Sequence, residues 1–167
     1  MILEHTYLNK INYLPLLIII SIYLLSSPLF GQSEKPQAII INTGVLGEIS
    51  KPRVKILDKT LESKLGEYFI IVPKEIFEEA KEKAFDELDY DKCTEDQCIM
   101  KIQEILQVDN AFKMELTHEE GDTQISLTWS TLDQKRVKQN YCEACTTKEM
   151  INSTSLLVEE LLGNKGT

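Results

Sequence analysis

Apolar side chains recur with two different periods along the chain, and these periods predict its helices and strands. Helical spacing of apolar residues follows Ser50, Pro73, Thr94 and Thr146, which open four predicted helices. Short apolar or alternating stretches predict strands at 38–41, 68–72, 112–117, 125–129 and 136–141. The predicted order of elements is therefore β-α-β-α-α-β-β-β-α.

The connections between these elements decide how the strands pair. The two early strands flank a helix, which predicts a parallel pair with a right-handed crossover. The late strands follow one another through short turns, and Glu119 to Asp122 has the composition of a hairpin turn. The predicted fold is an α/β (α+β) two-layer sandwich. It has a mixed sheet of about five strands and helices packed on one face.

The amino-terminal segment has the pattern of an export signal. An apolar run from Leu14 to Leu25 suits a signal peptide better than a membrane span of about 20 residues. We predict a signal peptide over 1–31, a linker over 32–36 and a single domain over 37–163. The domain is then periplasmic or secreted, and its mature part does not span a membrane. The alternative is an uncleaved segment that anchors the chain to the inner membrane.

Charge narrows the choice of partners. The chain has 167 residues and a formal net charge of −9. Removing residues 1–31 takes away one basic residue, Lys10, and one acidic residue, Glu4, so the net charge stays −9. Phosphate backbones repel such a surface, and we expect no nucleic-acid partner.

Four cysteines lie in two short pairs, Cys93 with Cys98 and Cys142 with Cys145. An even number of cysteines in an exported chain favours disulfides. A local bridge in each pair would contribute about 2 kcal/mol, and a bridge between the pairs about 4 kcal/mol. All three pairings stay open from sequence alone, although each local pair is already close in the unfolded chain.

Two other uses of sulfur are alternatives. Cys142 and Cys145 form a CxxC motif beside a predicted helix start, the pattern of a thiol-redox site. Four thiolates can also hold zinc, although the spacing of the first pair is wider than usual. We expect no metal and no other cofactor, because an oxidising compartment favours disulfides.

No other catalytic set stands out, so we predict that the chain is not an enzyme. His118 is the one histidine after the predicted signal peptide, and it lies in a polar turn beside acidic residues. No serine has an evident histidine partner, and no glycine-rich phosphate loop is present. A small-molecule site on a concave face of the sheet is a further alternative.

Several segments resemble a group of exported bacterial domains. They are the strand at 69–72, the connection Leu106-Gln107-Val108-Asp109 and the turn at Gly121-Asp122. Over about residues 37–162 the chain resembles the amino-terminal domain of TolB and the periplasmic domain of CsgG-type proteins. The resemblance implies a periplasmic, non-enzymatic module that works through contact with other envelope components.

The sequence therefore predicts a disulfide-supported accessory domain of the bacterial cell envelope, with an envelope protein as its partner. The polar strand at 136–141 is expected to lie at an edge of the sheet, where charge discourages unwanted pairing. Arg136, Lys138 and Tyr141 are the predicted interaction residues, because another chain could add a strand at such an edge.

Overall fold

A computed structural model describes residues 35–88 and 95–163 of the chain. Its sheet has five strands in the spatial order β2 (Ile70–Ile71), β1 (Gln37–Leu46), β3 (Asn110–Glu119), β4 (Asp122–Ser130) and β5 (Lys135–Glu143). β1 runs parallel to β2 and β3, while β3, β4 and β5 form an antiparallel meander. The predicted mixed sheet and element order are confirmed.

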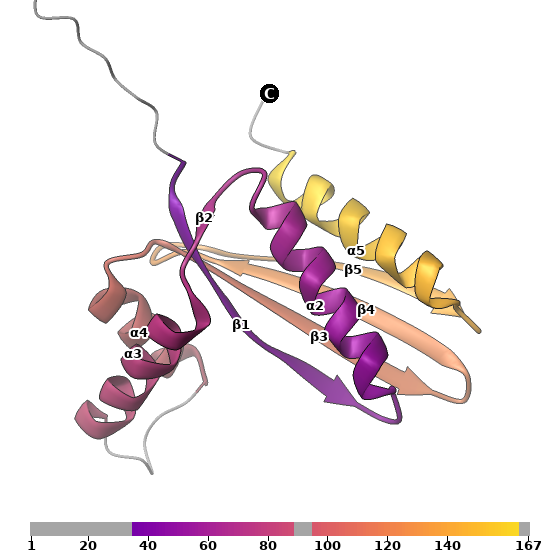
Figure 1. Ribbon diagram of the computed structural model, residues 1–167, viewed down its shortest axis with the longest axis horizontal. Coiled ribbons are helices and arrows are strands. Elements are labelled where there is room, and N and C mark those ends of the chain that lie inside the picture. The colour runs from indigo at the N-terminus through magenta and orange to yellow at the C-terminus, as the bar shows by residue number, and fades with distance from the viewer. Residues whose placement is uncertain (1–34, 89–94, 164–167) are drawn as a thin grey trace, which may run out of the picture. The chain divides into compact units, whose positions relative to one another are not determined.

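The main core lies between one face of the sheet and the helices α2 (Lys51–Leu65) and α5 (Thr147–Leu162) (Figure 1). The predicted alternation places Phe112 of β3 and Trp129 of β4 on this face. Their rings stack with centroids 6.0 Å apart, and Phe69 meets Phe112 edge-on at 5.2 Å. Sheet, α2 and α5 together are the predicted two-layer sandwich.

The other two helices correct one part of the prediction. α3 (Lys74–Glu87) and α4 (Glu95–Leu106) build a second cluster with Ile39 of β1 and Ala111 of β3. Their neighbours Ala38 and Phe112 belong to the main core, and successive strand residues point to opposite faces. The helices therefore lie on both faces of the sheet and not on one. The reason is that the start of β1 is apolar on both sides.

The β3–β4 turn and the start of α5 lie where the sequence predicts them. The β3–β4 hairpin turns at Glu120 and Gly121, both with positive φ (52° and 98°), as a tight two-residue loop requires. Thr146, the predicted start of the last helix, forms a capping box with Glu149 and begins α5. The predicted signal peptide, Thr94 and Cys93 lie outside the described residues. No helix within the described ranges is long and apolar enough to cross a membrane.

Candidate functional site

The predicted interaction strand lies at the edge of the sheet. Among the residues that the structure describes, β5 pairs only with β4 and ends the strand order, so its predicted edge position is confirmed. The backbone N–H of Tyr141 donates to the side-chain oxygen of Asn140 at 2.8 Å, so it points away from β4. Because backbone direction alternates along a strand, Val137 and Gln139 share this outward direction. β5 therefore presents a row of backbone donors and acceptors to the outside.

Arg136 and Lys138 lie on the helix-covered face of the sheet. Arg136 is opposite Trp129 in the β4–β5 register, and its guanidinium carbon is 5.3 Å from the centroid of the indole ring. Its Nε also donates to Gln134 Oε1 at 3.2 Å. Lys138 is half-buried and follows on the same side. These contacts hold Arg136 against the core and leave its charge at the edge.

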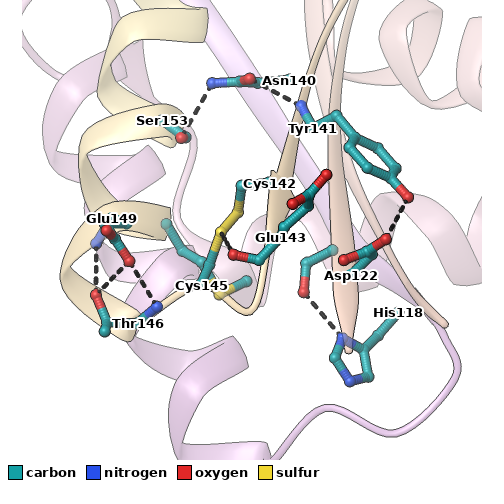
Figure 2. Close-up of a disulfide and its surroundings, with 12 residues drawn as sticks. His118, Asp122, Asn140, Tyr141, Cys142, Glu143, Cys145, Thr146, Glu149 and Ser153 are labelled. Atoms are coloured by element: carbon teal, nitrogen blue, oxygen red, sulfur yellow. Dashed lines mark hydrogen bonds between the residues drawn. A yellow bond between two sulfur atoms is a disulfide. The ribbon is translucent and has the colours of Figure 1, made fainter. Parts of the chain in front are cut away.

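Tyr141 lies on the opposite face, on the part of it that α3 and α4 leave uncovered, and 61% of its surface is exposed. Its hydroxyl donates to Asp122 Oδ2 at 2.9 Å (Figure 2). This hydrogen bond raises the pKa of the Tyr141 phenol above its ordinary value, and partial burial and the nearby carboxylates of Asp122 and Glu143 add to it. The three predicted interaction residues thus share one strand but divide between its two faces.

The uncovered face contributes residues that the sequence analysis missed. Val137 lies beside Tyr141 on this face and is 51% exposed. A shallow hollow of about 430 Å³ lies on the same face, and polar side chains such as Gln124, Ser126 and Gln139 line it. The two-residue period along β5 could have grouped Val137 with Tyr141 from sequence alone. The small-molecule alternative stays a prediction.

The CxxC turn joins β5 to α5. Cys142 and Cys145 form a disulfide with Cα atoms 5.8 Å apart, and both pack against the main core (Figure 2). Ala144, between them, has a φ of 47°, and its N–H donates to the carbonyl of Gly121 in the β3–β4 turn at 3.1 Å. The bridge, the turn and the hairpin therefore hold one end of the sheet together.

This geometry differs from a redox CxxC at a helix start. α5 begins at Thr147 and is capped by Thr146, whereas Cys142 is still in β5. The helix N-terminus that lowers a thiol pKa is thus capped by an oxygen and lies away from Cys142. Cys98 of α4 is disulfide-bonded too, and no cysteine in the described part of the chain is free.

Two further pairs of hydrogen-bonded side chains lie near this turn. The Nδ1 atom of His118 lies 2.9 Å from the hydroxyl of Thr123, and Asn140 donates to the hydroxyl of Ser153 at 3.1 Å. Within the described ranges, no three histidine, cysteine or acidic side chains gather as metal ligands would. The arrangement is a hydrogen-bonded support for the end of β5.

Comparison with known proteins gives likenesses to solved structures only. No protein-family model matches the chain, and no curated protein matches it. The LpoB C-terminal domain from Salmonella enterica is similar at 11% identity and a TM-score of 0.49, over 75% of this chain and 93% of that domain. The same domain from Escherichia coli gives 10% identity, a TM-score of 0.49 and the same coverage.

A third likeness is to lipoprotein GNA1162 from Neisseria meningitidis. The identity is 10% and the TM-score 0.44, over 78% of this chain and 99% of that one. The resemblance to TolB and CsgG stays a prediction. The function proposed below rests on the residues of this chain.

Proposed function

We propose that the chain is an exported, non-catalytic interaction domain of the bacterial cell envelope that binds a protein partner along β5. The observation that carries the proposal is the outer position of β5, where Val137, Gln139 and Tyr141 direct backbone groups away from β4. An extended segment of the partner can pair with this row, as in other cases of strand addition.

Side chains on the two faces of β5 supply the contacts beside that row. Val137 and Tyr141 offer exposed apolar surface on the uncovered face, and Arg136 and Lys138 offer positive charge on the other face. The chain has a net charge of −9, whereas Arg136 and Lys138 are two neighbouring positive charges on one face of β5. They favour a partner strand that carries acidic side chains on the helix-covered side.

Export and oxidation belong to the same proposal. Residues 1–31 direct the chain out of the cytoplasm, and all four cysteines, including Cys93, are oxidised there. The support is the disulfide distance between Cys142 and Cys145 and the packing of both against the core. Sulfur in this position braces the end of β5 beside the proposed binding row.

The test introduces a photo-crosslinking amino acid at Gln139 in the chain expressed in its native host. We expect an adduct with one envelope protein that is lost when Val137 is replaced by Pro, which removes an outward N–H and spares the bonds to β4. Val137→Thr keeps the N–H and is the matched control, in which the adduct should persist. An adduct that survives Val137→Pro, or that forms equally from Glu160 on α5, contradicts strand addition at β5.

Free-thiol titration of the protein recovered from cells separates this proposal from the thiol-redox or zinc alternative. The interaction domain should show no reactive thiol and no bound zinc. Reduced and reactive Cys142 and Cys145, or one equivalent of zinc, would overturn the scaffold role of sulfur.

A further inference from the structure

At the edge of the sheet farthest from β5, the outer strand is β2, which has only two residues and pairs with only the start of β1. The N–H groups of Ile70 and Val72 donate to the carbonyls of Pro36 and Ala38, both at 2.9 Å, and the pairing stops there. Pro73 follows, has no N–H to continue the ladder, and turns the chain into α3. β1 runs on to Leu46, and β3 pairs with it on one side, but within the described residues no strand continues β2 on the other side (Figure 1).

Backbone groups of β1 face this open edge. The carbonyls of Pro36 and Ala38 point toward β2, so the alternation of a strand directs the N–H and C=O of Ile40 the same way. Burial changes at the same point. Ala38 and Ile39 are fully buried beside β2, whereas Ile40 is only half-buried.

A groove of about 540 Å³ runs along this edge. Its floor is β1 from Ile40 to Thr43, and its walls are α2 on one side and the start of α3 on the other. The register of β1 shifts between Ile41 and Gly44, and the regular alternation of side chains is broken there, so that Asn42 lies on the α3 side together with Ile41. Asn42 donates to Glu78 on α3 at 3.4 Å, and Thr43 donates to Asp58 on α2.

The walls of the groove are mainly acidic. Asp58 and Glu62 lie on α2 and Glu75 on α3, with Lys74 as the one basic residue among those that line the groove. Glu62 and Glu75 are exposed. Glu78 lies about one helical turn after Glu75 on α3, and it already forms an ion pair with Lys81 at 3.1 Å. Acidic side chains therefore flank the strand edge on both faces, and Lys74 lies beside Glu75 on the α3 side.

We infer that this groove binds an extended, basic peptide segment of a partner protein, which adds a strand to β1 beyond β2. Backbone pairing with Ile40 supplies the register. Adjacent residues of a strand point to opposite faces, so two neighbouring Lys or Arg side chains reach the two walls, one toward Glu62 and one toward Glu75. The site lies at the other end of the strand order from β5 and is independent of binding there.

The experiment measures fluorescence anisotropy of a labelled, end-blocked peptide, Thr-Val-Thr-Lys-Lys-Val-Thr-Val, with the protein recovered from cells. The same peptide with a central Glu-Glu pair is the comparison. We expect the Lys-Lys peptide to bind and the Glu-Glu peptide not to. The double variant Glu62→Lys with Glu75→Lys should weaken the Lys-Lys peptide about tenfold, because two exposed attractions become repulsions.

The matched control is Glu79→Lys with Glu160→Lys. Both residues are exposed, lie outside the groove and give the same change in net charge, so binding should change less than about twofold. Amide exchange by NMR then places the peptide, and we expect new protection at Ile40 but not at Gln139. Equal loss in both double variants, or protection at β5 alone, would overturn the assignment, as would self-association through this edge without peptide binding.

Discussion

Asn110 is a buried polar residue that joins three strands, and its removal gives the most informative test of the core. Its side chain accepts a hydrogen bond from Trp129 Nε1 at 3.1 Å and donates to the carbonyl of Gln37 at 3.2 Å. Asn110 is 8% exposed and Trp129 is 3% exposed. The first of these hydrogen bonds is therefore shielded from water, which makes its loss costly.

The variant Asn110→Ala removes both bonds. Losing the acceptor of a buried indole N–H costs about 1–3 kcal/mol, and losing the bond to Gln37 about 1 kcal/mol. We expect the free energy of unfolding to fall by about 3 kcal/mol, measured by urea denaturation followed with far-UV circular dichroism. Native and variant proteins should unfold with the same slope, because the surface exposed on unfolding hardly changes.

A double-mutant cycle with Trp129→Phe isolates the hydrogen bond. Trp129→Phe also loses packing and the contact with Arg136, but these losses occur in both arms of the cycle and cancel. We expect the double variant to be less destabilised than the sum of the single variants by about 1–2 kcal/mol. Additivity within about 0.5 kcal/mol would refute the view that Asn110 and Trp129 act as a bonded pair.

Three further predictions concern the turns and the cap of α5. Replacing both Cys142 and Cys145 with Ser should lower the melting temperature by about 5–10 °C, corresponding to about 2 kcal/mol. Because this variant lacks the bridge, reductant should cause no further loss of stability from that position. Glu120→Asn should raise the free energy of unfolding by about 0.5 kcal/mol, because Asn adopts the left-handed backbone at φ 52° more readily; Glu120→Val should lower it. Backbone and side-chain hydrogen bonds from Thr146 lower the pKa of Glu149 below 4.5, so its contribution to stability is present above that pH and lost as pH falls through the lowered pKa. The difference in urea midpoint between the native protein and Glu149→Gln should therefore shrink between pH 6 and pH 3; a difference independent of pH would contradict this account.

Local chemistry in the sequence was enough to predict most elements. Alternation at Phe112, Met114 and Leu116 predicted a half-covered strand, and all three are fully buried on the face that α2 and α5 cover. The hairpin at Gly121 and the capping box at Thr146 were also readable, because each depends on residues only a few positions apart. The alternation along β5 held a further signal, the division of Lys138 from Tyr141, that the sequence analysis did not use.

The tertiary structure alone decided how these pieces surround the sheet. Ile39 and Ile41 indicate a second apolar face on β1. No residue near them in the sequence indicates that α3 and α4 cover this face. The groove beside β1 depends on how far β2 pairs before Pro73, and that depends on contacts between segments more than thirty positions apart. Periods and caps are properties of neighbouring residues and can be read along the chain. Strand partners and open edges are set by which distant surfaces pack together, and only the folded molecule determines them.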